Sequence, residues 1–196
     1  MEYLTHSLIK KSDAFEIVQK LKEEKSSWQD GKKTAGSHAE KIKQNFQLDK
    51  ESKLSDEIVD IVVNKIISNP LLKSFTLPSL IHGVMFTKSF AGDGYGTHLD
   101  NPYMPSGRSD LSFTLFLNEP NDYQGGELCI ETINKTEKIK LSAGEMIIYP
   151  STQLHSVAEV SDGERYVCVG WIQSYIQSNE DRNFLFGLDA GAKGLL

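Results

Sequence analysis

Residues 142–173, SAGEMIIYPSTQLHSVAEVSDGERYVCVGWIQ, contain three short apolar runs separated by turn residues. The runs 145–149, 155–160 and 165–173 are rich in β-branched and aromatic residues, which favour strands. Ala143-Gly144 and Asp162-Gly163 are turn pairs, and Pro150 ends the first run. Strands this short and this closely spaced predict a sandwich or a jelly roll, not a parallel βαβ sheet.

The same pattern of short apolar runs extends upstream to Pro78, whereas the apolar residues before Pro78 recur at helical spacing. Further strands are expected at 81–90, 111–118, 126–132 and 137–141. Helical spacing of apolar residues predicts helices over 12–25, 37–48 and 53–68. Residues 178–192 predict a C-terminal helix with an apolar stripe of Phe184, Leu185 and Leu188, which packs on the sheet or on another subunit. We therefore expect one integrated domain with a helical part at 1–78, a β core at 79–177 and a helical tail at 178–196.

Composition and charge argue against several classes of protein. The 196 residues are 39% hydrophobic and 24% charged, as in an ordinary globular protein. The net charge of −6 argues against a nucleic-acid partner, and no apolar run reaches the roughly 20 residues of a membrane span. The start, MEYLTHSLIKK, lacks signal-peptide features. Cys129 and Cys168 lie in apolar strands, so we expect reduced, buried thiols in a cytoplasmic protein, with a disulfide as the alternative.

A histidine and an aspartate two residues apart, His98 and Asp100, suggest a metal site. On an extended segment their side chains point to the same side. A third ligand, for which His155 at the start of a strand is the candidate, would complete two imidazoles and one carboxylate. That set leaves several coordination positions open and is typical of non-haem Fe(II) oxygenases. The preceding AGDGYG would permit close backbone approach and sharp turns, but taken alone it favours an ordinary glycine-rich hairpin turn.

Arg165 is the candidate anchor for an acidic co-substrate. It shares one strand face with Val167, Val169 and Trp171, which is unusual for a solvated arginine. The turn at 162–163 would bring it close to His155 as part of one hairpin. An internal bridge from Arg165 to an aspartate or glutamate is an equally valid interpretation. Among the other histidines, His6 and His38 are expected at the surface, and His82 is expected to be a core or edge residue.

The chain resembles the PKHD-type hydroxylases, a prolyl-4-hydroxylase-like branch of the Fe(II)/2-oxoglutarate dioxygenases. The matching stretches begin with DGKKTAG, K-x-N-x-Q-L and YGTHLDNP, and continue with RSDLSFTLFLNEPNDYQGGELCIE, KLSAGEMIIYPSTQLHSV, GERYVCVGWIQSYI and FLFGLD. They run in the family's order from about residue 28 to residue 189.

This resemblance implies a mainly β fold with flanking helices: a double-stranded β-helix (jelly roll) core with N-terminal helices packed on its major sheet. It implies Fe(II) held by His98, Asp100 and His155, with 2-oxoglutarate and O₂ as co-substrates. Arg165 matches the arginine that holds the distal carboxylate of 2-oxoglutarate. The implied reaction hydroxylates a C–H bond of a prolyl, other peptidyl or small-molecule substrate and releases succinate and CO₂. The carboxylate of Asp100 favours hydroxylation over halogenation.

The resemblance leaves several points open. Ascorbate as reductant is implied by the family alone, and a homodimer through the C-terminal segment is an expectation. Related enzymes often carry a tyrosine eight to ten residues before the metal histidine, where this chain has Lys88-Ser89-Phe90. The loop at 101–110 is either a lid or substrate-contacting segment, or a plain connection. A cupin-like metalloenzyme and a non-catalytic jelly-roll binding module are the alternative functions.

Overall fold

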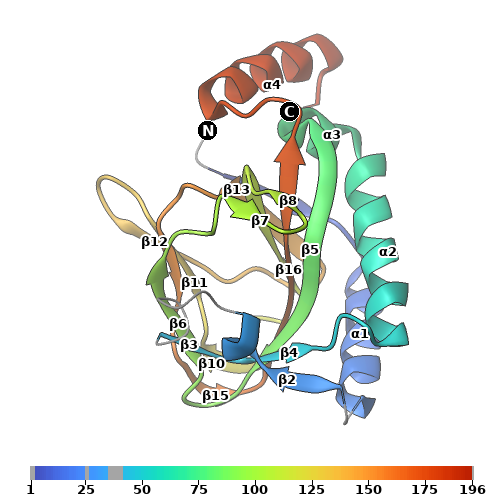
Figure 1. Ribbon diagram of the computed structural model, residues 1–196, viewed down its shortest axis with the longest axis vertical. Coiled ribbons are helices and arrows are strands. Elements are labelled where there is room, and N and C mark those ends of the chain that lie inside the picture. The colour runs from blue at the N-terminus through green and yellow to red at the C-terminus, as the bar shows by residue number, and fades with distance from the viewer. Residues whose placement is uncertain (1–2, 25–26, 35–41, 196) are drawn as a thin grey trace.

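The computed structural model describes residues 3–24, 27–34 and 42–195. These residues form two β-sheets that face each other, with helices on the outer face of the larger one (Figure 1). The major sheet has seven strands in the order β1 (Leu4–Ser7), β13 (Glu145–Pro150), β9 (Leu111–Phe116), β16 (Arg165–Ser174), β5 (Pro78–Ser89), β4 (Phe46–Leu48) and β2 (Trp28–Asp30).

The second, minor sheet has five strands. Their order is β12 (Thr136–Ile139), β11 (Leu128–Glu131), β14 (His155–Val157), β6 (Gly94–His98) and β3 (Lys43–Gln44). Two further pairs lie beside the sheets: β10 (Tyr123–Gly125) with β15 (Val160–Gly163), and β7 (Tyr103–Met104) with β8 (Gly107–Arg108). Every strand pairing in both sheets is antiparallel. The expected jelly-roll core of a mainly β fold is thus confirmed.

Alternation along the major strands separates two apolar layers. On β16, Tyr166 and Cys168 point outward to the helices, while Arg165 and Val167 point inward to the minor sheet. The inner layer is the smaller one and consists of Phe116, Leu128, Ile130, Ile139, Ile147, Tyr149 and Val167. The polar groups of the candidate site lie on this inner side, between the two sheets.

Helices cover the outer face of the major sheet, as expected (Figure 1). These helices are α1 (Lys11–Glu23), α2 (Lys53–Ser68) and α3 (Pro70–Thr76); α4 (Asn179–Lys193) packs on α3, and a 3₁₀ turn at Gly31–Thr34 lies beside β3. Ser52 caps α2 by accepting a hydrogen bond from the Ser55 backbone N–H at 3.1 Å. Asn69 ends α2 and caps α3, which opens on Pro70. The helices cover one side of the major sheet, and its other side faces the minor sheet.

The prediction of a helix over 37–48 is wrong for its described part. Residues 43–44 and 46–48 form strands β3 and β4, which extend the minor and the major sheet respectively. Its earlier residues, including His38, lie outside the described ranges. Helical periodicity failed here because short strands with one buried face can show the same apolar spacing as a helical turn. The first 78 residues therefore contribute edge strands as well as helices.

The C-terminal helix is present, but its packing face differs from the expected stripe. Phe186 and Ala190 are buried, and Phe186 packs edge-to-face on Phe75 of α3 at 5.2 Å. Phe184 and Leu188 are 67% and 58% exposed. The helix thus packs on α3, and the stripe read from the sequence faces solvent.

The two cysteines and the length of the helices bear on two further expectations. Cys129 and Cys168 are buried free thiols, so the disulfide alternative is wrong. Burial raises the pKa of the Cys168 thiol well above its ordinary value. None of the helices in the described part of the chain is long and apolar enough to cross a membrane.

Candidate functional site

His98, Asp100 and His155 come together at one end of the minor sheet. β6 and β14 are antiparallel neighbours, and His98 lies directly opposite His155 in their register. His98 Nε2 is 3.8 Å from Asp100 Oδ1, and His155 Nε2 is 3.9 Å from Asp100 Oδ2. One ligand atom from each residue can be chosen so that all three lie within 4.8 Å of one another. The structure thus brings together the three residues that the sequence singled out.

Backbone contacts fix which imidazole nitrogen faces the centre of this triad. His98 Nδ1 is 2.8 Å from the Gly96 carbonyl, and His155 Nδ1 is 2.9 Å from the Gln153 carbonyl. A carbonyl only accepts hydrogen bonds, so each Nδ1 carries a proton, and in the neutral ring each Nε2 then presents its lone pair to the triad. Burial, together with the neighbouring His155, lowers the pKa of His98 to about 4. Two imidazoles and a carboxylate fit a divalent iron ion.

Asp100 is tied to the opposite sheet through serine hydroxyls. Ser112, on the inner face of β9, donates a hydrogen bond of 2.5 Å to Asp100 Oδ2. Ser151 lies 2.8 Å from the Ser112 hydroxyl oxygen. Because the single proton of Ser112 is used on Asp100, Ser151 is the donor in this second contact. This chain orients the carboxylate, as outer hydrogen bonds do for metal ligands.

Tyr95 supports His98 from the side. Its ring stacks on the His98 imidazole with 3.7 Å between centroids and an interplanar angle of 20°. Lys43, opposite Tyr95 on β3, places its ammonium 5.3 Å from the Tyr95 centroid. Burial lowers the pKa of Lys43 to about 8, against the attraction of Asp100, and burial raises the pKa of Tyr95 to about 12. The imidazole is therefore held by a carbonyl at one edge and a ring on one face.

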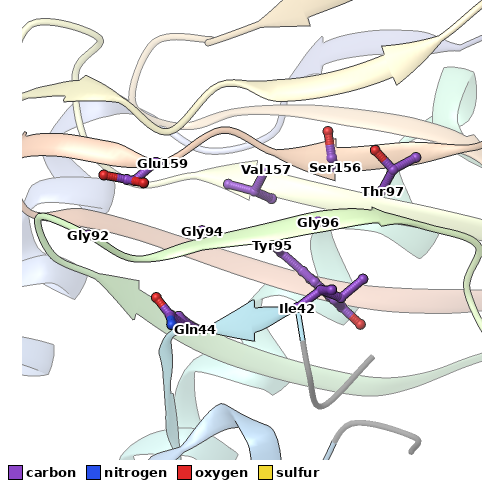
Figure 2. A pocket seen from close by; sticks show the side chains of 10 residues that line it. All are labelled: Ile42, Gln44, Gly92, Gly94, Tyr95, Gly96, Thr97, Ser156, Val157 and Glu159. Carbon is purple, nitrogen blue, oxygen red and sulfur yellow. The ribbon is translucent and has the colours of Figure 1, made fainter. Parts of the chain in front are cut away.

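Glycines let β3 and β14 approach β6 closely. A Cβ on Gly96 would lie 2.9 Å from Ile42 Cβ, and one on Gly94 would lie 3.1 Å from the Val157 carbonyl oxygen. Close backbone approach, the alternative to a plain hairpin turn, is thus what two of the glycines in AGDGYG permit. A hollow of about 330 Å³ lies along this segment. Figure 2 shows the residues that line it, with the side chains of Gln44 and Glu159 on opposite sides of β6.

Arg165 lies on the inner face of β16, as its strand pattern indicated, and is only 3% exposed. Its guanidinium carbon is 5.7 Å from the centroid of the Phe116 ring. Among the described residues no carboxylate forms an ion pair with Arg165, and its Nε atom has no hydrogen-bond partner. Burial lowers the pKa of Arg165, and nearby Tyr123 and Tyr149 oppose that effect. The internal bridge to an acidic side chain is therefore absent from the described structure.

The route by which His155 and Arg165 meet differs from the predicted hairpin. β14 joins the minor sheet, β15 pairs with β10, and β16 lies in the major sheet. The predicted strand over 155–160 is broken between Val157 and Val160, so the Asp162-Gly163 turn does not pair His155 with Arg165. Tyr149 connects the two instead: its ring is 5.1 Å from the His155 ring, and its hydroxyl interacts electrostatically with Arg165.

Sequence reasoning missed the supporting groups of this interior, chiefly Ser112, Tyr123 and Tyr149. A signal for Ser112 exists, because the alternation in LSFTLF places Ser112 and Thr114 on one face of β9 between outward-facing apolar residues. At the position where relatives often carry a tyrosine, Lys88 points outward and lies 4.2 Å from the Trp28 ring centroid. Ser89, the cross-strand neighbour of Arg165, carries no phenol, so the described structure has no tyrosine at residues 88–90 to serve this site.

His82 and the loop at 101–110 form a separate anchored unit. The His82 ring, buried as expected, lies 2.9 Å from the Ser106 hydroxyl and 3.0 Å from the Arg108 carbonyl. Arg108 makes a bidentate pair with Asp110, with both contacts at 2.7 Å. The loop is therefore the fixed hairpin β7–β8, which leaves Tyr103 68% exposed at its tip.

Comparison with known proteins identifies the family. A family model described as the 2OG-Fe(II) oxygenase superfamily matches residues 84–173, which include all four candidate residues. A PKHD-type hydroxylase of Prochlorococcus marinus strain NATL1A is 83% identical over 196 residues, which cover all of this chain and 89% of that protein. The PKHD-type hydroxylase of Prochlorococcus marinus strain MIT 9313 is 58% identical over 196 residues, which again cover all of this chain and 89% of that protein.

Solved structures agree on the fold. A prolyl-4-hydroxylase of Pseudomonas putida superposes with a TM-score of 0.63 at 16% identity, covering 89% of this chain and 94% of that chain. A prolyl hydroxylase from Trichoplax adhaerens gives a TM-score of 0.65 at 17% identity, covering 94% and 86%. With the relatives above, these comparisons place the chain in the PKHD-type hydroxylase family of Fe(II)- and 2-oxoglutarate-dependent dioxygenases.

Proposed function

We propose that His98, Asp100 and His155 hold the iron, and that Arg165 holds the distal carboxylate of 2-oxoglutarate. The observation that carries this proposal is the triad, in which the Nε2 atoms of His98 and His155 lie 3.8 Å and 3.9 Å from the Asp100 carboxylate. Arg165 supports it as a buried cation for which no described carboxylate supplies a partner. A planar guanidinium suits a carboxylate because it can donate two parallel hydrogen bonds.

Iron, 2-oxoglutarate and O₂ together supply the oxidising chemistry, which yields succinate, CO₂ and a hydroxylated substrate. The chain's own groups bind and orient. Ser112 holds the Asp100 carboxylate, and Tyr95 holds the plane of the His98 ring. The inner apolar layer, which includes Phe116 and Ile147, keeps water away from the space between Arg165 and the triad.

For the substrate we propose a prolyl or other side chain of a peptide, with a free small molecule as the second class. The support comes from the Trichoplax adhaerens neighbour, whose structure is a complex with a peptide fragment of a hypoxia inducible factor oxygen degradation domain. The hairpin β7–β8 begins three residues after Asp100 and presents the exposed ring of Tyr103. We assign this hairpin to substrate contact, so Tyr103→Ala should raise KM for the substrate more than it lowers kcat.

Two accessory properties follow from the same family membership. We propose ascorbate as a reductant that sustains turnover; succinate formation with and without ascorbate tests this directly. We also propose a cytoplasmic location, which the two buried free thiols support. Cell fractionation with a compartment marker tests the location.

The exposed apolar side chains of α4 support a homodimer through the C-terminal segment. Phe184, Leu185 and Leu188 lie at helical spacing and are exposed. The double variant Phe184→Ser, Leu188→Ser should therefore shift the molar mass in solution from dimer to monomer. A wild-type protein that is monomeric at every concentration tested would contradict the proposal.

The proposed function is tested with Asp100→Ala and Arg165→Gln. Succinate release is measured with Fe(II) and 2-oxoglutarate, and 2-oxoglutarate affinity is measured anaerobically on the Mn(II)-loaded protein. Asp100→Ala should abolish succinate release, and Arg165→Gln should weaken 2-oxoglutarate binding. Asp162→Ala, an exposed aspartate on β15, serves as the matched control and should leave both unchanged. The assignment of these residues fails if both site variants behave like this control.

A further inference from the structure

Two buried polar atoms beside each other lack a partner in the interior. The hydroxyl of Tyr123 and the Nε atom of Arg165 are both inaccessible to solvent, and within the described part of the chain neither makes a hydrogen bond of standard geometry, although the hydroxyl and the guanidinium interact with each other. More than nine in ten buried polar groups in native proteins have a partner. Since both side chains are almost fully buried, at 2% and 3% exposed, this pair is a built site for a polar ligand.

The position of Tyr123 is fixed from two sides. Lys140 donates a hydrogen bond of 2.7 Å to the Tyr123 carbonyl, and its ammonium lies 3.9 Å from the centroid of the Tyr123 ring. Gly126 leaves room between the ring and the arginine. A Cβ at Gly126 would lie 2.9 Å from Arg165 Cδ and 3.0 Å from Tyr123 Cε2. The ring and the guanidinium can therefore lie next to each other only because residue 126 has no side chain.

The electrostatics of this pair favour an anionic ligand. Burial raises the pKa of the Tyr123 hydroxyl, and the positive charge of Arg165 opposes that effect. At neutral pH the hydroxyl is thus a proton donor beside a cation, and both can point at one carboxylate. Lys140 adds a second positive charge close by, and Glu127, which interacts with both Lys140 and Arg165, adds one negative charge, so the two cations still outnumber the one carboxylate.

We propose that Tyr123 donates a hydrogen bond to the distal carboxylate of 2-oxoglutarate, alongside Arg165. The inference rests on the co-substrate site proposed above and adds a residue to it. It also answers the departure at residues 88–90, where this chain has no tyrosine and Lys88 points away from the interior. Tyr123 lies on β10, a different part of the fold, and supplies a hydroxyl from there.

Anaerobic titration of the Mn(II)-loaded protein with 2-oxoglutarate tests this role. Tyr123→Phe keeps the ring and removes only the hydroxyl, so the loss of one hydrogen bond to a charged group should raise Kd about ten- to a hundred-fold. Tyr166→Phe is the matched control, because Tyr166 is a buried tyrosine next to Arg165 that faces the outer layer. Its Kd should equal that of the wild type.

A second ligand separates a direct contact from a structural effect. 2-Oxobutyrate keeps the keto acid and lacks the distal carboxylate, so Tyr123→Phe should bind it as the wild type does. Equal losses for both ligands would mean that the hydroxyl shapes the fold and does not contact the carboxylate. Unchanged 2-oxoglutarate binding in Tyr123→Phe, with a clear loss in Arg165→Gln, would overturn this inference alone. A wild-type protein that fails to bind 2-oxoglutarate would instead overturn the proposed co-substrate site.

Discussion

Replacing Gly126 by alanine should damage the co-substrate site through space filling. Gly126 has a φ of +68°, a left-handed conformation that costs a residue with a Cβ about 1–2 kcal/mol. The added methyl would also lie 2.9 Å from Arg165 Cδ, whereas carbon atoms pack best at about 3.5–4.0 Å. Arg165 or the Tyr123 ring must therefore move by about 0.6–1 Å.

A shift of that size is enough to break hydrogen bonds. A donor moved from about 2.9 Å to about 3.6 Å from its acceptor no longer forms one, and a bond to a charged group contributes about 1.5–3 kcal/mol. We expect the Kd for 2-oxoglutarate to rise at least about tenfold. Overpacking adds about 1–3 kcal/mol to the backbone cost, so the free energy of unfolding should fall by about 2–5 kcal/mol.

Gly194→Ala provides the matched control. Gly194 has a φ of +60° after α4, and no atom lies within 4 Å of its hypothetical Cβ. In Gly194→Ala the free energy of unfolding should fall only by the backbone cost of about 1–2 kcal/mol, and the affinity for 2-oxoglutarate should stay the same. Urea unfolding and anaerobic titration of both variants measure the two quantities. If Gly126→Ala matched Gly194→Ala in both, the packing argument for Tyr123 and Arg165 would be refuted.

Three further predictions concern the triad and its surroundings. Ser112→Ala removes the 2.5 Å hydrogen bond to Asp100 and should weaken Mn(II) binding about 10–100-fold in calorimetric titration; unchanged affinity would contradict a role for that bond. Tyr95→Leu removes the ring stacked on His98 and should weaken Mn(II) binding, whereas Tyr95→Phe should not; an equal loss in both would point to the hydroxyl instead. Between about pH 8 and pH 10.5, Lys43 keeps its proton in the unfolded chain but has lost it in the folded protein. The free energy of unfolding of the wild type should therefore rise with pH relative to that of Lys43→Met. Urea unfolding across this pH range tests the prediction, and the same pH dependence in both proteins would refute it.

The β core and the candidate residues were accessible from sequence for identifiable reasons. Strict alternation along 165–173 placed Arg165 and Val167 on one face, and the structure puts both inside. The two-residue spacing of His98 and Asp100 predicted that their side chains point the same way. The position of His155 at the start of a strand made it the candidate third ligand. These patterns depend on strand geometry alone, which local sequence encodes well.

Partners across sheets could not be derived in the same way. Nothing local indicates that Ser112 meets Asp100, because their contact depends on how the two sheets face each other. The hairpin prediction failed for a related reason: the break after Val157 lets β15 pair with β10 instead of continuing β14. Short edge strands such as β3 are set by the sheet they join more than by their own residues.

The hydrogen bond between Ser112 and Asp100 joins the two sheets at the triad. The imidazoles belong to the minor sheet, whereas Ser112 and Arg165 belong to the major one. A ligand that contacts both the triad and Arg165 acts as a clamp across the sandwich and resists its opening. Amide hydrogen exchange in β6 and β14 should therefore slow on addition of 2-oxoglutarate and Mn(II), while exchange in α4, which lies outside the clamp, stays the same.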